Sequence, residues 1–203
     1  MSSNLPMQNR YFILNKPFNM VSQFISPDDV RLLGDIQFDF PEGTHAIGRL
    51  DNESEGLLIL TTNQKFTRLL YKYKARHTRT YLVMVQNEVS AETLKQLQEG
   101  VSIPIKEGAL YTAVPVAVEI VKEPVLLCKQ ATDRREAYPH TWLLITLTEG
   151  KFRQVRKMVF AVRHKCLRLI RLSIENIQLD DLEPGNVREI GEENCFNLLG
   201  IQP

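Results

Sequence analysis

The segment from Gly48 to Asn63, GRLDNESEGLLILTTN, constrains the fold more than any other part of the chain. A polar turn is followed by the apolar run from Leu57 to Thr61, which predicts a short buried strand. Asp51 comes just before this strand and two residues after Arg49. A half-buried carboxylate near a cation stays ionised away from bulk water, which suits chemistry. An ordinary surface turn is the alternative on composition alone.

Hydrophobic periodicity elsewhere predicts strands alternating with short helices. We expect strands at residues 11–16, 57–61, 80–86, 114–121, 142–147, 165–172 and 174–179. We expect helices at residues 30–36, 63–71, 90–98 and 151–162. Ser90 should cap the third helix and Gly100 should end it, whereas residues 129–140 should form an exposed loop. Strands that pair over long range around inserted helices indicate an α+β fold with a largely antiparallel mixed sheet.

The bulk composition is that of an ordinary globular protein, with 43% apolar and 24% charged residues. A chain of 203 residues suits one domain or two closely packed subdomains. We expect residues 1–10 to be a disordered tail and residues 11–203 to be folded. The sequence contains neither a long apolar run typical of a membrane span nor a segment typical of a secretion signal, so we expect a cytoplasmic protein. We also expect it to be a monomer. The three widely spaced cysteines predict neither a metal site nor a disulfide framework.

The net charge of +1 hides a segregation of charge along the chain. Residues 65–79 contain six Lys or Arg and no acid, and residues 151–171 contain eight Lys or Arg and no acid. Acidic residues collect after Glu175 instead. Two acid-free basic segments could line one surface that follows a phosphate backbone, or they could be two solvated helix faces.

The opening segment resembles the catalytic motif of the RsuA-type rRNA pseudouridine synthases, which convert uridine to its C-glycoside isomer. The residues at the spacing of that motif are Arg49, Leu50, Asp51, Ser54, Gly56, Leu57 and Asn63. The resemblance implies that Asp51 is the catalytic carboxylate. It also implies the pseudouridine synthase fold with a central RNA-binding cleft, and neither a cofactor nor a metal.

Two further segments resemble motifs of the same family. Arg79-Thr80-Tyr81 matches the second motif, which implies that Tyr81 stacks on the target uracil and is a candidate for handling the C5 proton. Tyrosine phenols ordinarily titrate near pH 10, so stacking suits neutral pH better than proton transfer does. The segment from Glu149 to Met158 matches the third motif, which implies that Arg156 pairs with Asp51 and keeps it charged.

The resemblance also implies a set of RNA contacts. Arg49 would occupy the space that the target base leaves in its stack. Leu169 and Ile170 would wall the uracil pocket, although plain core is the equal alternative. The remaining candidates are basic residues at family positions: Lys16, Arg79, Arg153 and Lys157.

Within the family, this chain resembles the short E-type group of large-subunit (23S) rRNA synthases, which lack an S4 RNA-binding domain. Two other function classes remain open from the residues alone. One is a non-catalytic rRNA-binding ribosome assembly factor with this fold. The other is a nucleoside hydrolase, which would need a second acid. Glu53 and Glu55 could supply that acid, but we expect both to be solvent-facing.

The two basic segments lead to a prediction about RNA binding. Without an S4 domain they must supply much of the affinity, through contacts that release counterions from phosphates. We expect the dissociation constant for rRNA to rise at least about tenfold between about 50 and about 200 mM salt. An affinity that stays flat across that range in a filter-binding titration would contradict this prediction.

Overall fold

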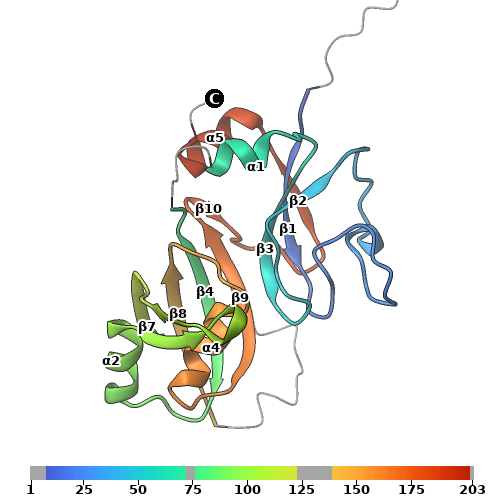
Figure 1. The fold of residues 1–203 in the computed structure, drawn as a ribbon. Helices are drawn as coiled ribbons and strands as arrows, with labels where there is room; N and C mark the ends of the chain where they lie inside the picture. Colours follow the sequence, from blue (N-terminus) through green and yellow to red (C-terminus); the bar gives the residue numbers. More distant parts are fainter. Residues whose placement is uncertain (1–7, 72–75, 123–138, 202–203) are drawn as a thin grey trace, which may run out of the picture. The chain divides into compact units, whose positions relative to one another are not determined.

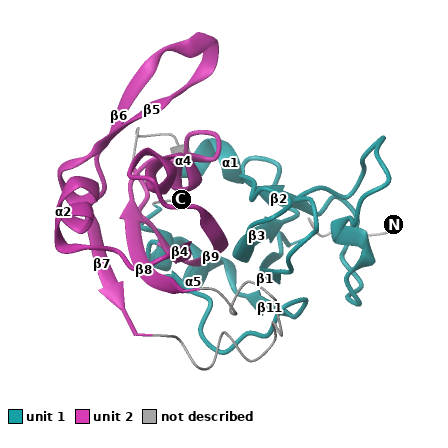
Figure 2. Cartoon of the chain, turned by 90° about the horizontal axis from the view of Figure 1, so that it is seen from below, with its two compact units in different colours: residues 1–75, 175–203 teal, residues 76–174 magenta. Residues whose placement is uncertain are grey.

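The computed structural model describes residues 8–71, 76–122 and 139–201. The chain divides into two compact units. Unit 1 combines Met1–Ala75 with Glu175–Pro203, and unit 2 is the continuous segment Arg76–Ile174 (Figure 2).

The sheet of unit 1 is built around β1 (Tyr11–Lys16), which pairs with β3 (Glu55–Thr61) on one side and β11 (Val187–Ile190) on the other. The short strand β2 (His45–Ile47) pairs with β3 (Figure 1). All three pairings are antiparallel. Every residue of β1 and β3 is buried, as the apolar run of β3 predicts.

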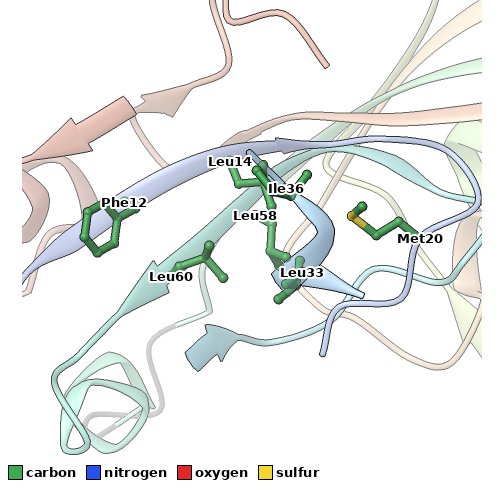
Figure 3. Packing of buried hydrophobic residues seen from close by; sticks show 7 residues of the cluster. All are labelled: Phe12, Leu14, Met20, Leu33, Ile36, Leu58 and Leu60. Carbon is green, nitrogen blue, oxygen red and sulfur yellow. The ribbon is translucent and has the colours of Figure 1, made fainter. Parts of the chain in front are cut away.

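One face of this sheet carries a compact apolar core (Figure 3). Alternate residues of a strand share a face, so Phe12 and Leu14 of β1 lie with Leu58 and Leu60 of β3. The other members of the core are Met20, Leu33 and Ile36. The helix expected at residues 30–36 is wrong, because the structure has a single 3-10 turn, η1 (Leu33–Asp35). That turn is sufficient to bury Leu33 against the sheet.

A second contact joins β1 to two helices of unit 1, α1 (Phe66–Tyr71) and α5 (Glu192–Leu199). The ring of Tyr11 lies edge-on to Phe66 and Phe196, with centroid distances of 5.3 and 5.8 Å. Its hydroxyl donates to Glu192 Oε2 at 2.5 Å and accepts from Asn63 Nδ2 at 2.8 Å. These contacts join the N-terminal segment of unit 1 to its C-terminal segment.

The remaining strand of unit 1, β10 (Ile177–Gln178), precedes β11.

Unit 2 holds a four-stranded antiparallel sheet and a separate hairpin. The order in the sheet is β9 (Cys166–Ile174), β4 (Arg79–Gln86), β8 (His140–Leu147) and β7 (Ala117–Val121). The helices are α2 (Ala91–Glu99) and α4 (Gln154–Ala161). The hairpin pairs β5 (Val101–Pro104) with β6 (Leu110–Ala113) around the turn η2 (Lys106–Gly108), and it projects from the rest of unit 2 in Figure 2.

The α+β class and the antiparallel pairing expected from the sequence are confirmed by these elements. Ser90 accepts a hydrogen bond from the backbone of Thr93, and Gly100 ends the helix, as expected. The sequence did not predict β2, β11 or α5. Of the loop expected at residues 129–140, residues 129–138 lie outside the described part of the chain, and His140 belongs to β8 instead.

The sequence analysis predicted a disordered tail over residues 1–10, and this tail is too long at its C-terminal end. Residues 1–7 lie outside the described part. Arg10, however, is held by Glu189 through two hydrogen bonds of 2.7 Å, and its backbone N–H donates to Thr62 Oγ1. A bidentate carboxylate therefore fixes the last residue of the expected tail. Among the helices in the described ranges, none is long and apolar enough to cross a membrane.

The buried side of α5 leads to a prediction about the reactivity of its cysteine thiol. Cys195 is fully buried, and burial together with the nearby Glu192 carboxylate raises the pKa of its thiol to about 12. The reactive thiolate is therefore scarce at ordinary pH. In a Cys128→Ser background, we expect iodoacetamide at about pH 8 to label the half-buried Cys166 and to spare Cys195 until denaturant is added. Peptide mapping that finds both cysteines labelled at similar rates would contradict this.

Candidate active site

The loop that carries Asp51 connects β2 to β3 in unit 1. Gly48 adopts a left-handed backbone, with φ of +70°, at the point where the chain leaves β2. The backbone N–H of Ser54 donates to the carbonyl of Asp51 at 2.9 Å and closes a tight turn. Within this loop Arg49 is exposed, Leu50 is buried and Asp51 is half-buried. The half-buried carboxylate at the entrance to a strand agrees with the sequence-based expectation.

The residue before Asp51 is fixed by one side chain, Ser22. The Ser22 hydroxyl donates to the carbonyl of Leu50 at 2.9 Å and accepts from the backbone N–H of Leu50 at 3.0 Å. Ser22 is itself buried, so these two bonds satisfy both main-chain groups of Leu50 away from water. Ser22, in the segment after β1, thus bonds the main chain of Leu50 as a partner strand would. These bonds fix the backbone position from which Asp51 follows.

Lys16 holds the residue on the other side of Asp51, and its expected contact with RNA is wrong. Lys16 is 0% exposed. Its ammonium donates to the carbonyls of Pro17 at 2.8 Å, Met20 at 2.6 Å and Asn52 at 3.4 Å. A buried ammonium requires such acceptors, and burial keeps it from phosphates. Lys16 therefore stabilises the Asp51 loop from within.

The two glutamates of the loop differ from each other. Glu53 is exposed, as expected. Glu55 is buried at the first position of β3, so the expectation that it faces solvent is wrong. The reason is the position itself, because every residue of β3 is enclosed by neighbouring structure.

The candidate residues of unit 2 lie on adjacent strands. Tyr81 of β4 is 8% exposed and lies directly opposite Arg171 of β9 and Ile145 of β8. Residues directly opposite each other project to the same face. Leu169 lies opposite Val83, two residues after Tyr81, and so shares that face.

Ile170 projects to the other face of the sheet. It lies opposite Leu82, and consecutive residues of a strand alternate between faces. The expectation that Leu169 and Ile170 wall the same pocket as Tyr81 is therefore wrong for Ile170, which belongs to the core of unit 2.

The sequence analysis did not distinguish two buried arginines on β9 from the exposed cations. Arg168 and Arg171 are each 4% exposed, and Arg171 is the direct neighbour of Tyr81. The sequence analysis counted both in one basic surface. Their place inside an apolar strand, CLRLIRLSI, was the signal that could have separated them from solvated cations.

The remaining basic candidates take three different positions. Arg156 is half-buried on α4. Arg79 begins β4 and donates to the carbonyl of His77 at 3.1 Å. Lys157 donates from its ammonium to the carbonyl of Pro104 at 2.7 Å, whereas Arg153 precedes α4 in a left-handed conformation.

The three residues expected to act in catalysis come from both units, Asp51 from unit 1 and Tyr81 and Arg156 from unit 2. Across the described ranges, no group of three or more His, Cys, Asp or Glu side chains could hold a metal ion. Unit 1 thus contributes a carboxylate on a fixed loop, and unit 2 contributes an aromatic ring and cations.

This combination agrees with the family to which the chain belongs. Residues 10–161 match the family model described as RNA pseudouridylate synthase, and the chain is a member of that family. It is therefore an isomerase that converts uridine to pseudouridine in RNA.

Two named relatives and one solved structure show which members of the family this chain is similar to. The chain is 36% identical over 184 residues to "Ribosomal large subunit pseudouridine synthase E" of Vibrio vulnificus, covering 90% of this chain and 76% of the relative. It is 30% identical over 191 residues to "Ribosomal small subunit pseudouridine synthase A" of Escherichia coli, covering 94% and 74%. The solved "Crystal structure of pseudouridylate synthase" is similar with a TM-score of 0.74 and 27% identity, covering 94% of this chain and 74% of that one.

The bonds to Leu50 lead to a prediction about the loop. Ser22→Ala leaves a buried N–H and a buried carbonyl unsatisfied, which costs about 1–3 kcal/mol of the free energy of unfolding. We expect that loss in urea denaturation, together with faster hydrogen exchange at the Leu50 amide. Ser26→Ala is the matched control, because the Ser26 hydroxyl also accepts a backbone N–H, from Asp28, but in an exposed loop. Equal effects of the two substitutions would contradict a special role for Ser22.

Proposed function

We propose that this protein isomerises a specific uridine of large-subunit (23S) ribosomal RNA to pseudouridine, with Asp51 as the catalytic carboxylate. The relatives named as large-subunit synthases support the substrate. The observation that carries the catalytic assignment is the fixed loop of Asp51. Ser22 holds the residue before Asp51 through two buried hydrogen bonds, and the buried Lys16 holds the residue after it through a hydrogen bond of 3.4 Å.

The reaction requires a carboxylate but neither an oxidant nor a reductant. The bond from N1 of the base to C1′ of the ribose breaks, and a bond from C5 to C1′ forms. The proton on C5 leaves and N1 takes one up, so the atoms balance. A carboxylate suits this reaction because it can attack the sugar or the base, or can remove a proton to give a glycal.

Three other residues take roles that follow from their chemistry. Tyr81 stacks on the uracil with a ring fixed in β4 between two neighbouring strands. Arg156 stabilises the charge of Asp51. The exposed Arg49 occupies the space left by the target base, which must leave its stack to react.

Binding of the RNA backbone falls to the basic residues that remain accessible. Arg79, Arg153 and Lys157 are half-buried and supply charge for phosphates. Leu169 shares the face of Tyr81 and contacts the base from that side. We infer that the protein works as a monomer on rRNA in the cytoplasm.

A non-catalytic assembly factor is the alternative function on this fold. Such a factor needs cations for phosphates, but it needs no half-buried carboxylate on a loop fixed from both sides. The isomerase is therefore favoured by the Asp51 loop itself.

Carbodiimide-dependent stops of reverse transcription map pseudouridine and test the proposal. We expect a stop at one uridine of a 23S transcript with the wild-type protein and a rate lowered at least about 10³-fold in Asp51→Asn. Glu53→Gln is the matched control, since it removes an exposed carboxylate two residues away and should keep full activity.

Each contrary outcome identifies what fails. Full activity of Asp51→Asn would overturn the catalytic assignment. Modification of a 16S transcript alone would overturn the large-subunit substrate. Tight binding without modification would favour the assembly factor, and an abasic site in place of pseudouridine would favour a hydrolase.

A further inference from the structure

Two large aromatic side chains of unit 2 are exposed to solvent without serving the core. Phe152, two residues before α4, is 73% exposed, and Phe160, near the end of α4, is 76% exposed. The buried residues of this helix are on its other side: Gln154, Val155, Met158 and Val159. Packing of unit 2 therefore does not account for either ring.

The turn that presents Phe152 is held in one conformation. The backbone N–H of Lys151 donates to Gln154 Oε1 at 2.9 Å, and the backbone N–H of Gln154 donates to the carbonyl of Lys151 at 3.0 Å. Gln154 Nε2 also donates to Glu149 Oε1 at 2.7 Å. Arg153 has φ of 54° and ψ of 32°, a conformation that side chains other than glycine rarely adopt. The turn thus directs Phe152 outward in a fixed way.

One cation lies over the ring of Phe152 and another over the ring of Tyr111. The ammonium of Lys157 lies 5.5 Å from the centre of the Phe152 ring and is fixed by the carbonyl of Pro104 on β5. The ammonium of Lys151 lies 4.1 Å from the centre of the Tyr111 ring on β6. Glu149 is the nearby acid, and both of its oxygens already accept hydrogen bonds, from Gln154 and from Tyr111.

The second ring continues the same surface along the helix. Lys157 and Phe160 lie three residues apart within α4 and so project to one side of it, and Phe152 and Arg153 belong to the turn that leads into this helix. We call Phe152, Arg153, Lys157 and Phe160 the α4 stripe. In the sequence its two cations lie between its two flat apolar rings.

We propose that the α4 stripe binds single-stranded RNA by stacking unpaired bases on Phe152 and Phe160 while Arg153 and Lys157 contact the phosphates. This inference rests on the proposed function, because it identifies how flanking nucleotides of the rRNA substrate are held. Aromatic rings interleaved with cations fit a nucleic acid strand, which offers a flat base and a phosphate at each step. An apolar protein partner would bury the cations unfavourably.

Fluorescence anisotropy tests this proposal by measuring the dissociation constant for a labelled single-stranded RNA of about 12 nucleotides. Asp51→Asn serves as the background, so that no base is isomerised during the measurement. We expect Phe152→Ala to raise the dissociation constant about tenfold, as the loss of one stacked base does. Phe152→Leu should weaken binding in the same way, because it keeps apolar area but lacks a flat ring. Phe152→Trp should keep the affinity.

Ile25→Ala is the matched control, since Ile25 is an apolar residue of unit 1 that is 83% exposed. It should leave the affinity unchanged. Thermal melting should show equal stability in all variants, because none of these side chains is buried.

The contrary results are separable from failure of the proposed function. Unchanged binding by Phe152→Ala, or full binding by Phe152→Leu, would overturn the stacking whether or not the wild type makes pseudouridine. If RNA binding stayed unchanged while Phe152→Ala abolished self-association in sedimentation, the stripe would be a protein interface instead. Binding of no RNA by any variant would overturn both inferences.

Discussion

The site depends on the hydrogen bonds that the segment after β1 makes to the backbone of the Asp51 loop. Ser22 bonds both main-chain groups of Leu50, and the Lys16 ammonium bonds the carbonyl of Asn52. Since every residue of β1 is already paired with residues 56–61 of β3, these contacts also join the loop before β3 to the end of β1 and the segment after it. A half-buried carboxylate can be aimed only if its backbone is fixed, and here buried polar groups do so.

Burial separates the cations of this protein into two kinds. Lys16, Arg168 and Arg171 are almost completely buried, whereas Lys157 and Arg153 remain partly open to solvent beside exposed aromatic rings. The two kinds cannot be interchanged, because a buried cation needs fixed acceptors and a cation that binds phosphate must be open to solvent. The basic surface of this chain is therefore smaller than its count of Lys and Arg indicates.

The elements that the sequence predicted are those that carry their own signal. The strand at residues 80–86 has apolar residues on both faces, and β4 is indeed flanked by β8 and β9. The helix after Ser90 has its cap and its terminal glycine, and both act as expected. By contrast, α5 and β11 lie in a stretch rich in acids, and each depends on partners from the start of the chain. For α5 these are the ring and the hydroxyl of Tyr11, and for β11 they are the backbone of β1.

Motifs and hydrophobic patterns were sufficient to predict the family and the α+β class, both of which are confirmed, and they also name the candidate catalytic residues. Motif spacing and hydrophobic alternation are local properties that survive without knowledge of the fold. Only the tertiary structure decided what each cation and each apolar side chain faces. It enclosed Lys16, directed Ile170 away from the face of Tyr81, buried Glu55 and left Phe152 in solvent. The physical reason is that exposure depends on neighbours brought together by long-range pairing, which residue type and spacing alone do not specify.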